Sequence, residues 1–180
     1  MKVNWGCANT VAPGWFNSDR EDYPGISHVG DLLAGLPLPD GSVEIVVANH
    51  SLQMIPYVDL PAALGELVRV LVPGGILRLL VPDVFGAEGA FAAYRRNRRE
   101  WFPVANDVER LTGGKLAAYG LWYSTARSQF TAAWLQSLVL KSGCSPAVAA
   151  VGVSMFGSDE SLELDTRAGE TLVVEGRKHG

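Results

Sequence analysis

The sequence is poor in the residues that build disulfide frameworks and metal centres. Among 180 residues there are two cysteines and three histidines. Cys7 and Cys144 lie far apart and form neither a C-x-x-C pair nor a recognisable metal set. A buried disulfide between them is the less favoured alternative to two reduced thiols. The cysteine content is typical of a reduced intracellular protein, so we expect a cytoplasmic location and no metal.

An excess of positive charge and long apolar runs are also missing. The chain has 15 lysines and arginines against 19 acidic residues, a net charge of -4. This balance disfavours nucleic acid as a partner, because nucleic-acid binding needs a basic face. The longest apolar runs, such as residues 76–82, fall far short of the ~20 residues needed to cross a bilayer. Met1 leads directly into an expected strand, so we expect neither a signal peptide nor a membrane partner.

What is present is the composition of a globular domain. Hydrophobic residues make up 48% of the chain and charged residues 19%, which excludes a disordered protein. A chain of this length buries well over half of its unfolded surface. We therefore expect a single domain over residues 1–180. Within it, residues 84–127 are rich in aromatic residues and arginine and form a variable segment.

Strand and helix patterns alternate along the chain. The β-branched run at 43–49 is typical of a strand buried on both faces of a parallel sheet. Apolar residues at helical spacing predict a helix over 60–71, and Pro73-Gly74-Gly75 terminates it. Further strands are expected at residues 2–5, 15–18, 26–29 and 76–82, and a second helix at 130–142.

Three strand candidates follow the second helix, at residues 146–154, 161–165 and 171–178. The last two, joined by residues 166–170, are expected to form a hairpin. Strand, helix and strand with tight Gly/Pro joints predict a βαβ unit. The fold class is therefore α/β, with a Rossmann-like, mostly parallel sheet and an antiparallel C-terminal edge strand.

The connection between the first two expected strands is unusually short. Residues 7–14 can return along a short strand, but they cannot also include a helix of ordinary length. We expect the first crossover helix to be truncated, so one face of the first strands lacks its usual cover. Either the C-terminal segments shield that face or a second copy of the chain does, as a homodimer.

Several motifs, in order along the chain, resemble those of one enzyme family. Asp31, the stretch LPLPDGSVE at 36–44 and the stretch ELVRVLVPGG at 66–75 resemble the pattern of class I S-adenosylmethionine-dependent methyltransferases of the type 11 kind. The opening segments VNWGCA at 3–8 and PGWFNSD at 13–19 resemble a short-loop subgroup. The resemblance continues through KSGC and VEGRK near the C-terminus and is weakest over residues 84–127.

This resemblance implies S-adenosylmethionine as cofactor, S-adenosylhomocysteine as product and a small-molecule methyl acceptor. Asp19 would bind the ribose hydroxyls, and Asp31 with Leu32 would hold the adenine edge. Three residues would line the methionine portion: Gly6, Cys7 and Ala8. Asn49 and His50, at the carboxyl end of the fourth strand, would face the cofactor and the acceptor, in agreement with the place where ligands bind in parallel sheets.

Methyl transfer from a sulfonium depends mainly on positioning, and a base is needed only where the acceptor loses a proton. His50 is the first candidate base, and its alternative is a helix-start residue bonded to nearby backbone. Asp83 is the second candidate, and its alternative is an N-cap.

The variable segment contains the candidate substrate residues. Arg95 and Arg99 either form a solvated helix face or attract an anionic substrate. Trp122 and Tyr123 belong either to an aromatic lid or to the core.

Two departures from the family pattern leave a second function open. Ala8 stands where the family has glycine, and Gln53-Met54 stands where it has Glu-His. The chain is therefore interpreted as a methyltransferase or, alternatively, as a degenerate relative that binds a cofactor or a protein partner without catalysis. A nicotinamide dehydrogenase and an esterase are disfavoured, because the G-x-G-x-x-G and G-x-S-x-G motifs are absent.

Overall fold

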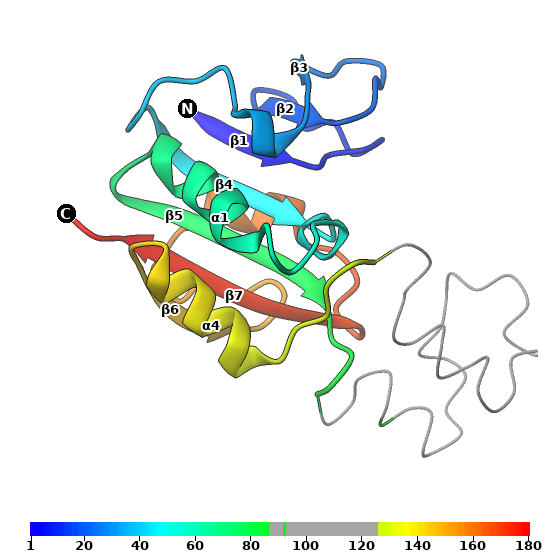
Figure 1. The fold of residues 1–180 in the computed structure, drawn as a ribbon, viewed down its shortest axis with the longest axis vertical. Helices are drawn as coiled ribbons and strands as arrows, with labels where there is room; N and C mark the ends of the chain where they lie inside the picture. Colours follow the sequence, from blue (N-terminus) through cyan, green and yellow to red (C-terminus); the bar gives the residue numbers. More distant parts are fainter. Residues whose placement is uncertain (87–91, 93–125) are drawn as a thin grey trace, which may run out of the picture.

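The computed structural model describes residues 1–86, 92 and 126–180. Within these residues seven strands form one sheet, in the order β3-β2-β1-β4-β5-β7-β6 (Figure 1). Neighbours among β1 to β5 pair in parallel, whereas β7 is antiparallel to both β5 and β6. The strands are β1 Lys2–Trp5, β2 Phe16–Asp19, β3 His28–Val29, β4 Val43–Asn49, β5 Leu71–Pro82, β6 Cys144–Ala149 and β7 Thr171–Lys178.

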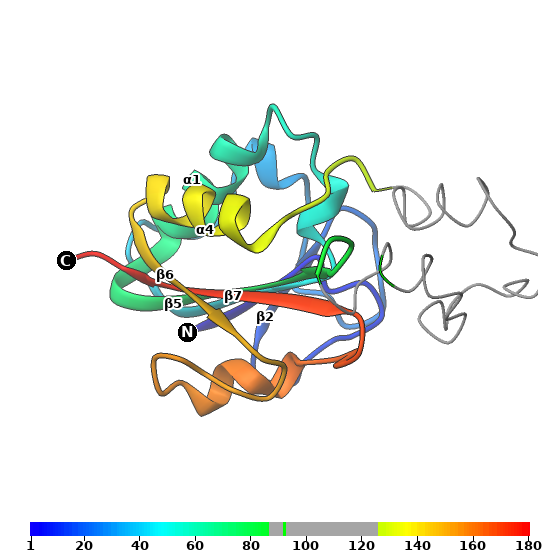
Figure 2. The same ribbon diagram turned by 90° about the horizontal axis from the view of Figure 1, so that it is seen from below.

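Helices and the C-terminal connection cover the two faces of this sheet. Helices α1 (Leu60–Val70) and α4 (Ala132–Lys141) lie on one face, and the 3₁₀ helix η5 (Asp159–Leu164) lies on the other (Figure 2). Two further 3₁₀ turns, η1 (Leu32–Ala34) and η2 (Leu52–Met54), follow β3 and β4. None of the helices in the described part of the chain is long and apolar enough to cross a membrane.

The predicted α/β class and the mostly parallel sheet are confirmed, and strands 43–49 and 171–178 coincide with β4 and β7. Strand β5 begins earlier than expected, at Leu71, because Leu71 pairs with Val43 before the register shifts at an irregularity. The antiparallel strand β7 lies one position in from the edge, between β5 and β6.

The expected strand at 161–165 and its hairpin are wrong. These residues form most of η5 and its end. Strand β7 already pairs with β5 on one side and β6 on the other, so neither of its edges is open to this segment. Ser161 and Leu164, three residues apart on one side of η5, are buried, while the residues directly before them, Glu160 and Glu163, are exposed.

The first crossover lacks a helix, as predicted, since residues 6–15 contain only turns and irregular backbone. A buried amide organises this loop. The Asn17 side chain donates to the carbonyls of Ala12 and Trp15, and its oxygen accepts from the Ala12 amide and from Asn4. Because each of its polar groups has a partner, a short connection can replace the usual helix without leaving buried groups unsatisfied.

The chain itself covers the face that this helix would have covered. Residues 150–170, here called the C-terminal strap, cross that face between β6 and β7 (Figure 2). Leu164 of the strap packs in a cluster with Trp15 and Val47, and the Trp15 indole donates to Glu163 at 3.0 Å. The first of the two predicted covers, the C-terminal segment, is therefore observed, and this face gives no reason to invoke a second copy.

Candidate functional site

A cavity of about 310 Å³ lies at the carboxyl ends of the first four strands. Each of these strands contributes the residue at its end or just after it: Gly6, Asp19, Gly30 and His50. Open α/β sheets bind ligands at this position, where the loops diverge from the strand ends. The cavity is therefore the candidate functional site.

Two residues with positive φ shape the β1 corner of the cavity. Gly6 has a φ of 68°, and a Cβ there would lie 2.2 Å from the Cβ of Ser51. Only glycine combines this conformation with this approach. Ala8 has a φ of 44°, in the left-handed region that favours glycine. The sequence thus departs from the family's glycine at a position where the backbone still adopts the conformation that glycine favours.

Asp19 is held in place by backbone amides at the β2 corner. One carboxylate oxygen accepts from the Ala8 amide at 2.9 Å, and the other accepts from the Glu21 amide at 3.1 Å. A carboxylate has about four lone-pair sites, so each oxygen keeps acceptor capacity for a ligand. The loop after β1 and the end of β2 are thereby fixed to each other across the cavity.

The β3 corner is built by Asp31 and Leu32. Asp31 accepts from the Leu33 amide at 2.9 Å and so caps η1. Leu32 is buried and lines the cavity. A Cβ on Gly30 would lie 2.5 Å from the His28 ring, so glycine lets this ring pack against the turn that follows β3.

His50 forms the β4 corner and has a φ of 51°. Its Nε2 lies 2.8 Å from the Thr171 hydroxyl, and its Nδ1 is buried. Burial, together with the charge of Arg167, lowers the pKa of His50 to about 4. The imidazole is therefore neutral at pH 7, with its Nε2 engaged by Thr171, and the role of general base stays a prediction.

Three other candidate residues do not line the cavity. The Asn49 side chain donates to the Leu164 carbonyl at 2.6 Å and faces the C-terminal strap. The Cys7 thiol is buried, and burial, with the charge of Asp19, raises its pKa. Asp83 accepts from the Gly86 amide at 2.8 Å and so closes a turn after β5, in line with its alternative as a local cap. Cys7 and Cys144 are both free thiols.

Sequence reasoning missed much of the cavity wall. The additional lining residues are Trp5, Arg20, Glu21, Tyr23, Gly30, Ser51, Met54 and Ile55. Of the two residues that replace the family's Glu-His, Met54 lines the cavity, whereas Gln53 is buried and donates to the His50 carbonyl. The backbone carbonyl of Gln53 also accepts hydrogen bonds from the backbone amides of Arg127 and Ser128. Gln53 therefore holds backbone together, and no local pattern in the sequence signals that role.

The wall of the cavity is acidic. Three carboxylates, from Asp19, Glu21 and Asp31, line it together with one guanidinium, from Arg20. This charge suits a cationic ligand better than a polyanion. Among the residues that the structure describes, no cluster of His, Cys, Asp or Glu could hold a metal ion. Four candidate substrate residues lie outside the described residues: Arg95, Arg99, Trp122 and Tyr123.

Comparison with known proteins gives the same picture in sequence and in fold. Residues 11–79 match the family model described as "Methyltransferase domain". A probable methyltransferase of Aspergillus luteorubrus, ltbC, is 49% identical over 49 residues, which are 27% of this chain and 17% of that protein. The chain thus aligns with only a small part of that curated relative.

Solved structures share the fold at low sequence identity. A SAM-dependent methyltransferase of Thermotoga maritima, described as a possible histamine N-methyltransferase, has a TM-score of 0.62 at 20% identity, covering 99% of this chain and 82% of its own. The trans-methyltransferase CalH, solved as a complex with SAH, has a TM-score of 0.53 at 14% identity, covering 98% of this chain and 51% of its own. The predicted resemblance to class I S-adenosylmethionine-dependent methyltransferases is therefore confirmed, by the sequence of residues 11–79 and by the fold of the described chain.

Proposed function

We propose that the chain is an S-adenosylmethionine-dependent methyltransferase acting on a small-molecule acceptor, and that the cavity binds the cofactor. The observation that carries the proposal is the convergence of Gly6, Asp19 and Asp31 on one acidic cavity at the strand ends. S-adenosylmethionine carries a sulfonium and an ammonium group, which suit that lining. The similar CalH structure was solved as a complex with SAH, which supports a cofactor of this class for a chain of this fold.

The residues present fit such a ligand. Asp19, already oriented by the Ala8 and Glu21 amides, has acceptor capacity for the two ribose hydroxyls. Gly6 lines the cavity with backbone alone, which the methionine portion could approach, and Leu32 offers an apolar wall beside Asp31 for the adenine.

The cofactor supplies the electrophilic methyl group when it is bound. The chain's own contribution is then to orient donor and acceptor and to exclude water, which can account for much of a rate enhancement. The neutral His50 contributes to the wall of the cavity. Roles for Arg95, Arg99, Trp122 and Tyr123 toward the acceptor stay predictions, as do a cytoplasmic location and a homodimer.

Calorimetric titration with S-adenosylmethionine and S-adenosylhomocysteine tests the proposal, using wild type, Asp19→Ala and Asp22→Ala. Asp22 is exposed and does not line the cavity, so its variant matches the change in charge without touching the site. We expect micromolar binding to wild type and to Asp22→Ala. Hydrogen bonds to a charged group contribute about 1.5–3 kcal/mol, so Asp19→Ala should weaken binding roughly 10- to 150-fold.

Absence of binding of either ligand to wild type at millimolar concentration would overturn the proposal. Equal weakening by Asp19→Ala and Asp22→Ala would show that Asp19 acts only through its charge at a distance. Binding without methyl transfer to any acceptor would instead support the degenerate relative.

A further inference from the structure

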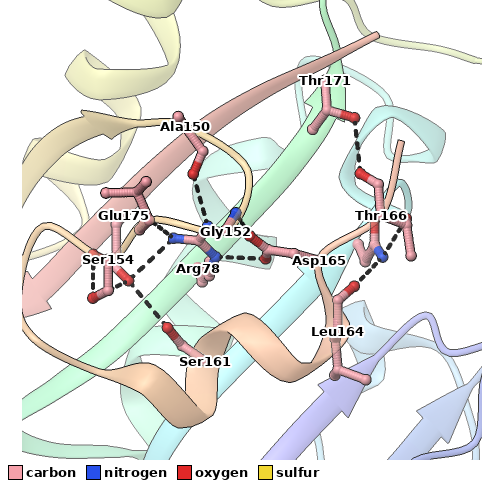
Figure 3. Close-up of polar contacts among 12 residues, drawn as sticks. Arg78, Ala150, Gly152, Ser154, Ser161, Leu164, Asp165, Thr166, Thr171 and Glu175 are labelled. Atoms are coloured by element: carbon pink, nitrogen blue, oxygen red, sulfur yellow. Dashed lines mark hydrogen bonds and ion pairs between the residues drawn. The ribbon is translucent and has the colours of Figure 1, made fainter. Parts of the chain in front are cut away.

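The C-terminal strap is fixed to the sheet by a buried cluster of charges. The Arg78 side chain is fully buried, and it donates from Nε to Asp165 at 2.7 Å and from Nη1 to Glu175 at 3.3 Å (Figure 3). The same guanidinium donates to the carbonyls of Ala150 and Val153. Because Arg78 lies on β5 and Asp165 on the strap, this pair holds the strap against the centre of the sheet.

From Asp165 the strap continues to the end of β4, beside the cavity. The Asn49 side chain donates to the Leu164 carbonyl at 2.6 Å and to the Thr166 hydroxyl at 3.0 Å. Figure 3 shows Leu164, Asp165 and Thr166 following one another from the charge cluster towards Thr171. The strap therefore reaches the residue that contacts His50.

The Thr171 hydroxyl joins the strap to the ring of His50. It lies 2.9 Å from the Arg167 carbonyl and 2.8 Å from the His50 Nε2. A carbonyl oxygen can only accept, so the single hydroxyl hydrogen is committed to Arg167. The oxygen of Thr171 must then accept, and the His50 Nε2 must carry a hydrogen. The opposite assignment would leave two oxygens 2.9 Å apart with no hydrogen between them.

We infer that Thr171 is a positioning residue of the cavity, which fixes the ring of His50 with a hydrogen on Nε2 and so orients the residue that forms the β4 corner. The C-terminal strap then has two roles, since it covers the sheet face and also orients one corner of the candidate site. The consequence for cofactor binding rests on the proposed function, whereas the tautomer itself does not.

Nitrogen-15 NMR of the histidine rings in the ligand-free protein tests the tautomer directly. The chain has three histidines, and His50→Asn identifies the signals of His50; asparagine tolerates the positive φ there. At pH 7.5 we expect a protonated Nε2 and an unprotonated Nδ1 in wild type. Thr171→Val removes the hydroxyl with little change in shape and should shift the ring towards the other tautomer or a mixture. Thr171→Ser should restore the wild-type pattern.

Binding of S-adenosylhomocysteine to the same proteins tests the positioning role. Loss of one hydrogen bond, about 0.5–1.5 kcal/mol, predicts an affinity lowered roughly 2- to 12-fold in Thr171→Val and restored in Thr171→Ser. A protonated Nδ1 in wild type, or a tautomer unchanged in Thr171→Val, would overturn the inference. A shifted tautomer with unchanged affinity would overturn the positioning role. Absence of binding to wild type would instead count against the proposed function, and the tautomer would still be readable.

Discussion

Removing Asp165 should show how strongly the buried charge cluster holds the C-terminal strap. Asp165 is Arg78's bidentate partner, and its side chain is 4% exposed. Breaking a buried ion pair from one side typically costs about 3–5 kcal/mol, because the remaining charge stays in the protein without its partner. Glu175 still contacts Arg78 at 3.3 Å, so we place Asp165→Ala near the lower end, at about 3 kcal/mol.

Urea unfolding followed by intrinsic tryptophan fluorescence measures this free energy. With a slope of about 2 kcal/mol per M, the midpoint of Asp165→Ala should fall by about 1.5 M, at an unchanged slope. Asp40→Ala is the matched control, since Asp40 also pairs with an arginine, Arg69, but its side chain is 81% exposed. Exposed pairs contribute about 1 kcal/mol or less, so this variant should lie close to wild type.

A shape-preserving variant separates the charge from the packing. Asp165→Asn keeps the volume of the side chain and one acceptor, so it should lose most of the ion pair without opening a cavity. We expect it to fall between wild type and Asp165→Ala. If the free energies of unfolding of Asp165→Ala and Asp40→Ala lay within about 1 kcal/mol of each other, the charge cluster would not be what holds the strap.

Two further predictions concern the residues with positive φ. Ala8→Gly should raise the free energy of unfolding by about 0.5–1 kcal/mol, because it relieves an alanine held in the left-handed region. Ala62→Gly, on the exposed side of α1, should lower that free energy by a similar amount. Melting temperatures that change in the same direction for both variants would contradict this. The pKa of His50 is about 4 in the folded chain and about 6.5 in the unfolded chain. The unfolded chain therefore takes up a proton more readily, and the contribution of His50 to stability is lost as pH falls from about 6.5 to about 4. By pH 5 this loss amounts to about 2 kcal/mol of the free energy of unfolding. Urea denaturation at pH 7.5 and pH 5 should show the loss in wild type but not in His50→Asn. Equal losses of stability in the two proteins would contradict the burial of a neutral imidazole.

Local patterns in the sequence determined much of the fold. The β-branched run became β4 and the 3.6-residue spacing became α1, because both patterns reflect burial of one element against a sheet. The short first connection likewise determined that no helix would fit there. Gly6, Asp19 and Asp31 were placed at strand ends by the same reasoning, and these ends meet at one cavity because parallel strands end at the same edge.

Tertiary contacts alone decided the rest, because their partners lie far apart in the sequence. Segment 161–165 has the composition of a strand, but both edges of β7 were already occupied, so it became part of a 3₁₀ helix over the open face. Arg78 gave no sign within an apolar strand that its partners would be Asp165 and Glu175, 87 and 97 residues away. The tautomer and orientation of His50 depend in the same way on a hydroxyl 121 residues further along the chain, and no local pattern carries that information.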